Sequence, residues 1–275
     1  MSIKKQVKKT INSLLKPLNY RITVRGLQHF LVEEYETTKK LYHNTIDQIQ
    51  GYYTTFLDAK YEVSAKRNKL LENLLGTEIS EALHIVTALR ETSILNGDVC
   101  EFGVAQGRTS ALICNEISNS SKNIWFFDSF EGLSAPTIED ELIDDVANLG
   151  TMEAYAGSMA SPEWMLMESV SKVEFPLDRI RIRKGFINDT LQKGNLPVSV
   201  SFAFVDFDLY APIRDTLFFL NEVINEGGII IIDDYDFLSS GVKKAVDEFY
   251  FDNHSRYTLN VPSKYLGNFA ILRRR

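Results

Sequence analysis

Four aspartates follow two apolar runs in the second half of the chain. Asp206 and Asp208 end the run SFAFVDFD, and Asp233 and Asp234 end the run GGIIIIDD. A carboxylate at the edge of an apolar strand is costly to desolvate unless a partner balances its charge. Carboxylate oxygens are the ligands that Mg²⁺ and similar hard cations prefer. The four side chains therefore indicate a shared divalent cation. The alternative is that they cap helices and tune the local charge without a metal.

A turn that contains two glycines forms a second candidate site. Residues 101–113, EFGVAQGRTSALI, have the pattern of a strand, a turn and a helix. Gly103 and Gly107 would let a ligand approach the backbone closely, and the first amides of the helix would face its negative charge. The spacing is G-x-x-x-G and not the dinucleotide-binding fingerprint. Taken alone, the turn is therefore as compatible with an ordinary strand-to-helix connection as with a ligand site.

The next apolar run, NIWFFDSFEG, ends in Asp128. An acid roughly 20 residues beyond a glycine turn accepts the hydroxyl groups of a ribose in dinucleotide-binding folds. The turn and the acid together favour a nucleoside ligand over the alternative that Asp128 only caps the following turn. Phe130, just past the run, is the candidate for contact with that ligand.

The elements that must position these residues alternate between strands and helices. The patterns predict strands at 98–104, 123–129, 179–186, 201–208 and 227–234, and helices at 77–96, 107–118, 162–173, 211–225 and 240–252. Such alternation indicates a doubly wound α/β fold with a parallel sheet covered on both faces. The last runs, YTLNVPS and YLGNFAILRRR, predict an antiparallel hairpin at one edge. The carboxyl ends of parallel strands share one edge of the sheet, so we expect the aspartates and the glycine turn to meet there.

Two segments lie outside this pattern. Residues 1–76 read as an N-terminal helical extension, which leaves residues 77–275 as the main domain. The span from Glu131 to Trp164 is a long connection, and such loops serve either as lids and binding loops or as mobile surface excursions.

Composition and charge indicate which partners and which cellular location to expect for the protein. The net charge of −7 gives no reason to expect nucleic acid as a partner. The two cysteines, the absence of a transmembrane-length apolar run and the lack of a signal-peptide pattern predict a cytoplasmic protein. Residues 1–30 carry seven basic and no acidic side chains on an amphipathic pattern, so residues 2–25 either pack on protein or contact an anionic inner membrane face. The apolar N-terminal helices predict a homodimer or a higher homo-oligomer.

A set of motifs resembles the macrocin O-methyltransferase family. They are EFGVAQGRTSALI, FFDSFEGL, RKGFINDTL, FVDFDLYAP and GGIIIIDDY followed by GVKKAVDEF, and they span roughly residues 80–255. The resemblance implies a Rossmann-like methyltransferase sheet, S-adenosylmethionine as methyl donor, a divalent cation such as Mg²⁺, and a sugar hydroxyl as acceptor.

The resemblance also implies roles for individual residues. Asp206, Asp233 and Asp234 would bind the metal, and Asp208 would be the general base. The residues expected around the methyl donor are Glu101, Gly103, Gly107, Thr109, Ser110, Asp128, Ser129, Phe130, Gly185, Phe186 and Asp206, of which Gly185 and Phe186 would lie near its adenine.

The implied chemistry agrees with the chemistry of the residues. A sugar hydroxyl is a very weak acid, which a bound cation makes more acidic and a neighbouring carboxylate then deprotonates. Two vicinal hydroxyls would chelate the ion, so a diol-bearing sugar or glycan is the expected acceptor. One alternative is an O-methyltransferase for a catechol or another small hydroxylated metabolite. Another, of a different class, is a non-catalytic nucleotide-binding or scaffold subunit.

Overall fold

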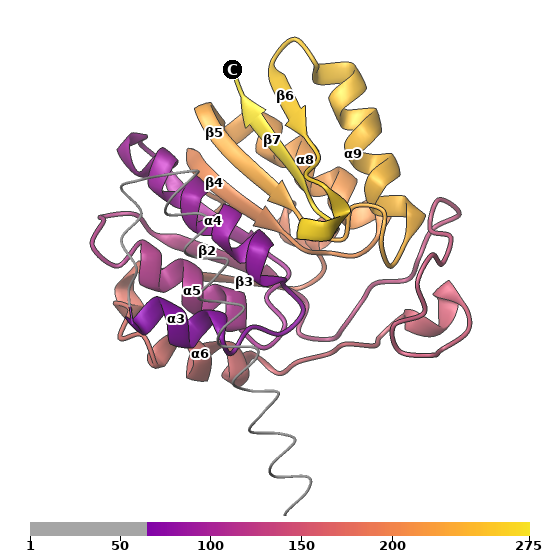
Figure 1. Cartoon of the computed structure of the whole chain (residues 1–275), viewed down its shortest axis with the longest axis horizontal. Helices are drawn as coiled ribbons and strands as arrows, with labels where there is room; N and C mark the ends of the chain where they lie inside the picture. Colours follow the sequence, from indigo (N-terminus) through magenta and orange to yellow (C-terminus); the bar gives the residue numbers. More distant parts are fainter. Residues whose placement is uncertain (1–64) are drawn as a thin grey trace, which may run out of the picture. The chain divides into compact units, whose positions relative to one another are not determined.

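The computed structural model describes residues 65–275, in which a mixed seven-stranded sheet carries helices on both faces (Figure 1). The strands are β1 (Asp98–Phe102), β2 (Ile124–Asp128), β3 (Ile180–Lys184), β4 (Val200–Val205), β5 (Ile224–Ile232), β6 (Tyr257–Asn260) and β7 (Ala270–Arg274). Their order across the sheet is β3-β2-β1-β4-β5-β7-β6. The first five strands run parallel, and β7 pairs antiparallel with both β5 and β6. The predicted doubly wound, Rossmann-like sheet with its antiparallel C-terminal hairpin is confirmed.

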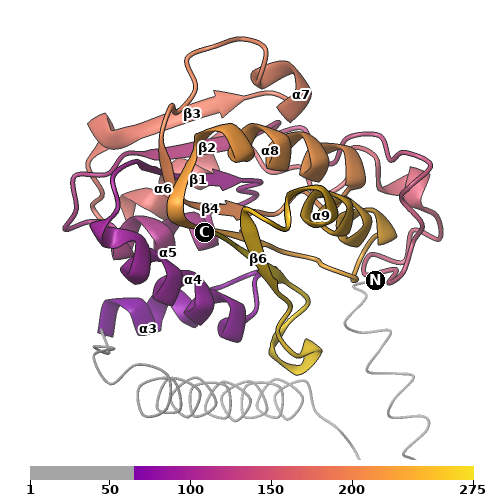
Figure 2. The same cartoon turned by 90° about the horizontal axis from the view of Figure 1, so that it is seen from above.

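The helices divide between the two faces of the sheet (Figure 2). One face carries α4 (Ile79–Glu91), α5 (Arg108–Glu116) and α6 (Glu163–Ser171), with α3 (Ala65–Leu71) packed on α5. The other face carries the single-turn α7 (Ile187–Thr190), α8 (Tyr210–Val223) and α9 (Ser240–Asn253). Short 3₁₀ helices lie at Thr92–Ile94, Met152–Tyr155, Leu177–Arg179 and Lys264–Leu266.

The apolar strand sequences follow from burial on both faces. In β5, Ile229 and Ile231 pack under α4 and α5, whereas Ile230 and Ile232 pack under α8 and α9. Successive strand residues point to opposite faces, so a strand covered on both sides needs an unbroken apolar run. The four consecutive isoleucines are the result, and the polar residues that follow them fall at the end of the sheet.

The connections leave a crevice between β1 and β4. These strands are neighbours, but the chain leaves β1 for α5 on one face and leaves β4 for α8 on the other. The strand order reverses at this point, and in open α/β sheets such a reversal is where ligands bind. The crevice lies at the carboxyl ends of both strands, where the sequence predicted a site.

The long connection after β2 folds against the same end of the sheet. Met152, Tyr155, Leu209 and Leu238 form a small buried cluster, so the connection is packed onto the segments that follow β4 and β5. Leu142 also forms an isolated bridge with Ser239. The connection is thus an integral wall beside the strand ends.

The predicted extension of residues 1–76 is described only in part. The amphipathic segment at 2–25 and the rest of the extension before residue 65 lie outside the described residues. Within the extension, α3 packs against α5, and Arg67 Nε donates a hydrogen bond of 2.8 Å to Glu116 Oε1. One compact unit of the chain spans Glu62–Arg275 and includes α3. Over residues 65–275, none of the helices combines the length and the hydropathy needed to cross a bilayer.

Candidate active site

The aspartates occupy the first positions beyond two neighbouring strands. The sheet hydrogen bonds continue past the strand ends, because the amide of Asp206 donates to Phe102 O at 2.7 Å and that of Asp233 donates to Val205 O at 2.9 Å. Asp208 and Asp234 then adopt left-handed backbone conformations, with φ of 61° and 56°. Such conformations are uncommon outside glycine but are tolerated by Asp. The two turns bring the side chains of β4 and β5 back toward one another.

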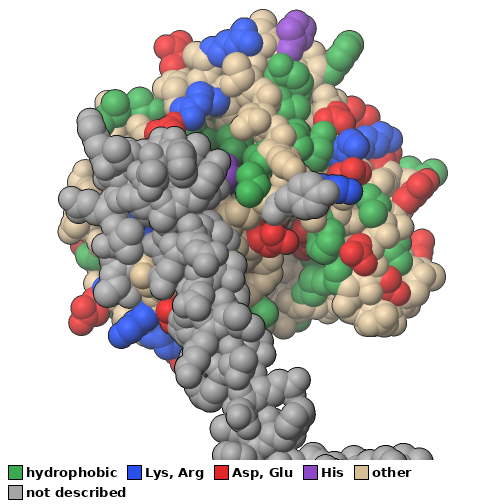
Figure 3. All heavy atoms as spheres, viewed as in Figure 1, with side chains coloured by type: hydrophobic (Ala, Val, Ile, Leu, Met, Phe, Trp, Pro, Cys, Tyr) green, Lys and Arg blue, Asp and Glu red, His purple; other side chains and the backbone are tan. Residues whose placement is uncertain are grey.

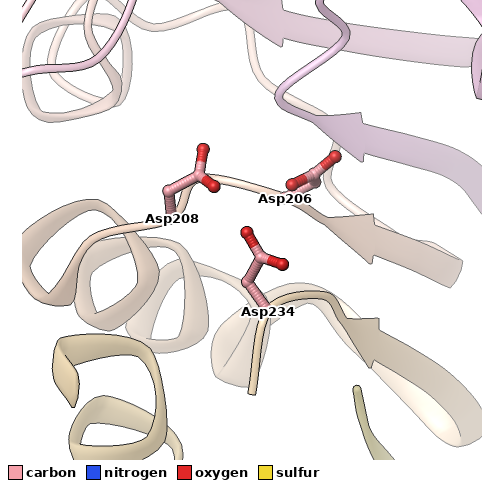
Figure 4. Close-up of side chains that lie close together, drawn as sticks. All are labelled: Asp206, Asp208 and Asp234. Atoms are coloured by element: carbon pink, nitrogen blue, oxygen red, sulfur yellow. The ribbon is translucent and has the colours of Figure 1, made fainter. Parts of the chain in front are cut away.

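Three carboxylates converge as a result (Figure 4). Oxygen atoms of Asp206, Asp208 and Asp234 all lie within 4.8 Å of one another. Burial and the neighbouring carboxylates raise the pKa of Asp206 and of Asp234 well above the usual range. Within residues 65–275, none of the three pairs with a Lys or Arg side chain. Negative charge gathered without a counter-charge fits a divalent cation, which prefers this set of oxygen ligands.

Asp233 is not one of this group of three, although it lies close enough to Asp206 to raise the pKa of that carboxyl group, and it faces a further acid. Its neighbour is Glu81, a buried residue of α4. Burial raises the pKa of Glu81 to about 8, and burial together with Glu81 raises the pKa of Asp233. The residues predicted as metal ligands are therefore placed differently: Asp206 and Asp234 meet Asp208, and Asp233 meets Glu81. The sequence analysis missed Glu81, although an acid on the apolar stripe of the predicted helix 77–96 was a signal of it.

The glycine turn lies against the end of β4. Gly103 has a φ of 80°, and a Cβ atom there would lie 1.9 Å from the carbonyl oxygen of Asp206. Asp128 shapes the same turn, because its Oδ2 accepts hydrogen bonds from the amides of Val104 at 2.7 Å and Ala105 at 3.2 Å. Its Oδ1 accepts from the amide of Phe130 at 2.6 Å. A carboxylate has about four acceptor positions, so Asp128 both organises the turn and keeps acceptor capacity for a ligand.

Behind the turn lies a buried carboxyl group. Glu101 is 1% exposed and lies beside Ser110, and its Oε2 has no hydrogen-bond partner within residues 65–275. Burial raises the pKa of Glu101 well above the usual range. A buried acceptor without a partner is rare in folded proteins.

One cavity of about 800 Å³ joins these features. The predicted site residues that line it are Gly103, Asp128, Ser129, Gly185, Phe186, Asp206, Asp208, Asp233 and Asp234. The predicted residues placed behind its wall are Glu101, Gly107, Thr109, Ser110 and Phe130. Of these, Phe130 packs in the core under α5 and α6, and Thr109 hydrogen-bonds Thr77.

Part of the remaining wall comes from segments that the sequence motifs do not cover. The connection after β2 contributes Val146 and Met159, and the second turn of α8 contributes Arg214 and Asp215. In the space-filling view, acidic side chains mix with hydrophobic ones on the right-hand side, where Figure 1 draws this connection (Figure 3). The cavity thus has an acidic floor at the strand ends and a mixed, partly apolar wall, which suits an amphipathic acceptor.

Comparison with known proteins places the chain among O-methyltransferases. The family model for macrocin-O-methyltransferase (TylF) matches residues 28–262. A Streptomyces olivaceus protein, 8-demethyl-8-(2,3-dimethoxy-alpha-L-rhamnosyl)-tetracenomycin-C 4'-O-methyltransferase, is 25% identical over 177 residues. That match covers 59% of this chain and 66% of the relative, just under two thirds of its length.

Solved structures share the fold. The O-methyltransferase NovP superposes with a TM-score of 0.61 at 21% identity, covering 86% of this chain and 99% of NovP. The calicheamicin methyltransferase CalS11 superposes with a TM-score of 0.56 at 20% identity, covering 84% and 91%. An O-methyltransferase from Bacillus cereus, solved in complex with SAH, gives a TM-score of 0.52 at 13% identity, covering 85% and 100%. At sequence identities this low, the three superpositions are evidence for a shared fold.

Proposed function

The chain belongs to the macrocin-O-methyltransferase family, and from that membership we propose that it transfers a methyl group from S-adenosylmethionine to a hydroxyl group of a sugar. The sugar would be part of a glycosylated natural product or a polysaccharide intermediate. The observation that carries the proposal is the convergence of Asp206, Asp208 and Asp234 within 4.8 Å, beside the glycine turn and in one cavity.

The donor would occupy the β1 and β2 side of the cavity. Gly103 lines the cavity at the turn, Asp128 would lie at the ribose position of this fold, and Gly185 and Phe186 line the cavity beyond β3. Asp206 is one of the converging carboxylates and also lines the cavity close to the glycine turn, so it would contribute both to the donor site and to the metal site.

The acceptor would lie over the aspartates. Asp206, Asp233 and Asp234 would hold Mg²⁺ or a similar ion, which leaves Asp208 as the base. When bound, such an ion supplies Lewis acidity that makes a sugar hydroxyl more acidic. Asp208 would accept the hydroxyl proton while the hydroxyl oxygen bonds to the methyl carbon and the bond from that carbon to sulfur breaks. Asp208 lines the cavity beside the other carboxylates, as this role requires.

The size and chemistry of the cavity support a sugar with a vicinal diol. Two neighbouring hydroxyls would chelate one ion at the carboxylates, and a volume of about 800 Å³ accommodates a donor with a glycosyl group. The Streptomyces olivaceus relative is named for a rhamnosyl-bearing substrate, which favours a hexose or deoxyhexose acceptor.

Calorimetry and a methyl-transfer assay test this proposal together. S-adenosylmethionine is titrated into the full chain, and transfer to a panel of sugar, nucleotide-sugar and catechol acceptors is then followed with Mg²⁺, with EDTA, and after Mg²⁺ is restored. We expect donor binding, transfer to sugars and loss of transfer in EDTA. Transfer to catechols alone would replace the acceptor class, and no donor binding under any condition would refute the enzyme and favour a scaffold role.

Two proposals concern residues outside the described range. We propose that residues 2–25 contact either an anionic membrane or a second subunit, and that the chain forms a homo-oligomer. Vesicle flotation and light scattering of the full chain, each compared with a deletion of residues 2–25, test them. Identical behaviour of both proteins in both measurements would remove the contact of residues 2–25, and a monomeric mass of the full chain would remove the homo-oligomer.

A further inference from the structure

Asp140 is a buried acid in the connection after β2 and has four hydrogen bonds. Its side chain is 7% exposed. Oδ2 accepts from the amide of Thr137 at 2.7 Å and from its Oγ1 at 2.9 Å. Oδ1 accepts from the amide of Tyr210 at 2.8 Å and from Ser239 Oγ at 2.8 Å. A single carboxylate therefore joins three segments that are far apart in the sequence.

Two of these segments carry the converging aspartates. Tyr210 begins α8 and closely follows Asp208, while Ser239 caps α9 and follows Asp234 in the same loop. Ser239 Oγ accepts from the amide of Gly241 at 2.9 Å, so Asp140 reaches the start of α9 through the cap. Helix N-termini present positive dipole ends and unpaired amides. The negative charge of Asp140 thus stabilises the starts of both helices.

The backbone on either side of this contact adds further hydrogen bonds and a close approach. The amide of Ser240 donates to Glu141 O at 3.0 Å, and that of Ile143 donates to Leu238 O at 2.9 Å. A Cβ atom on Gly241 would lie 1.9 Å from Asp140 Oδ1, so this close approach needs glycine there. Ser240 Oγ also donates to Glu139 O at 2.8 Å, so the connection is fastened to the loop after β5 on both sides of Asp140.

We propose that Asp140 is a positioning residue for the methyl-transfer site, which fixes the separation of Asp208 and Asp234 by tying the start of α8 to the start of α9. The inference rests on the function proposed above. Asp208 and Asp234 have left-handed backbones, which persist only where the surroundings hold them. Asp140 supplies that restraint from a third segment and touches neither carboxylate itself.

Hydrogen exchange of the full, metal-free chain tests the restraint. In Asp140→Ala, we expect the amides of Tyr210 and Gly241 to exchange about tenfold faster or more, because one loses its acceptor and the other loses the anchor of its cap. Asp145→Ala is the matched control. Asp145 is in the same connection and accepts from Leu149, Gly150 and Tyr155, but it has no bond to α8 or α9. Unchanged exchange at Tyr210 and Gly241 would overturn the inference.

Manganese titration separates positioning from mere stability. We expect Asp140→Ala to raise the Kd for Mn²⁺ by about 10-fold to 100-fold, with Asp145→Ala unchanged and Asp140→Asn in between, since the amide keeps one acceptor oxygen. Kinetically, kcat should fall while the KM for S-adenosylmethionine stays constant. Faster exchange with an unchanged Kd for Mn²⁺ and an unchanged kcat would make Asp140 merely structural.

If Asp140→Ala does not fold, Ser239→Ala, which removes one of the four bonds, replaces it. Failure of the wild-type protein to bind Mn²⁺ would instead refute the proposed metal site, and this inference with it.

Discussion

At the scale of single residues, the site depends on side chains of one type in different surroundings. Asp206 and Asp234 lie close to other carboxylates, and burial raises the pKa of each. Asp233 lies beside Glu81. Asp140, in contrast, faces amide and hydroxyl donors and stabilises two helix starts. The residue type alone does not distinguish a candidate ligand, a base and a structural anchor, whereas the partners of each carboxylate do.

The role of Asp208 as general base predicts a specific kinetic defect. In Asp208→Asn, the shape is kept but the proton acceptor is lost, so kcat should fall by about 10²-fold to 10⁴-fold. The affinity for S-adenosylmethionine, measured by calorimetry, should stay constant. Asp215→Asn is the control, because Asp215 lines the same cavity but pairs with Arg214. An Asp208→Asn enzyme with wild-type kcat would contradict the assignment.

His84 predicts a pH dependence of stability. Burial lowers the pKa of His84 below its ordinary value of 6.5, so the fold favours the neutral ring. The unfolded chain binds the proton more readily, and the stability that His84 contributes is therefore present above pH 6.5 and lost as the pH falls below it.

The measurement compares His84→Gln with the wild type. Urea unfolding from about pH 7.5 to about pH 5.5 should show a smaller loss of stability in the variant, since Gln does not titrate. Carboxyl groups with a raised pKa, such as Glu81, have the opposite dependence but are present in both proteins. Equal pH slopes would argue against a half-buried ring that the fold keeps neutral.

At the scale of elements, the site depends on how closely the turn after β1 approaches the end of β4. The hydrogen bonds of the sheet extend past both strands, so the turn and the aspartate segment are held side by side. Gly103 permits this contact, and α5 and α8 then leave toward opposite faces. Neither strand forms the crevice alone, because each supplies one wall of it.

Gly103→Ala should therefore destabilise the domain and weaken donor binding. Its positive φ costs about 1–2 kcal/mol for a residue with a side chain, and the clash with Asp206 O adds about 1–3 kcal/mol. Gly150→Ala is the matched control, since Gly150 has a φ of 86° but a Cβ atom there would meet no other atom within 4 Å. Denaturant unfolding should give a larger loss for Gly103→Ala, and equal losses would mean that the turn relaxes freely.

At the scale of the whole molecule, two core layers hold the sheet from both sides. Residues of α4, α5 and α6 form one layer, and residues of α8 and α9 form the other. The segment α3 adds to the first layer through Leu70, and Arg67 pairs with Glu116. The compact unit Glu62–Arg275 thus contains both core layers.

Two fragments test where the domain begins. A fragment of residues 62–275 should unfold cooperatively and bind S-adenosylmethionine as the full chain does. A fragment of residues 77–275 lacks α3 and should be less stable by about 2–5 kcal/mol, the cost of removing a large buried side chain such as Leu71. Thermal unfolding and calorimetry of both fragments provide the measurement. Equal stability of the two fragments would place the start of the domain at residue 77.

The sequence by itself determined the order of strands and helices, the covered parallel sheet and the edge hairpin. These features can be predicted because strands and helices have characteristic patterns of apolar residues over short stretches of sequence. The unbroken run of isoleucines in β5, which predicts a strand buried on both faces, is an example. It also placed Asp128, Asp206 and Asp234 at one end of the sheet, since parallel strands all end there.

Only the tertiary structure decided which of these acids meet. The left-handed turns at Asp208 and Asp234 redirect their side chains, and the pairing of Asp233 with Glu81 depends on where α4 packs. The bonds of Asp140 to Tyr210 and Ser239 join residues 70 and 99 positions apart. Contacts over such separations depend on packing among whole elements, and that packing has no local periodicity from which to predict it.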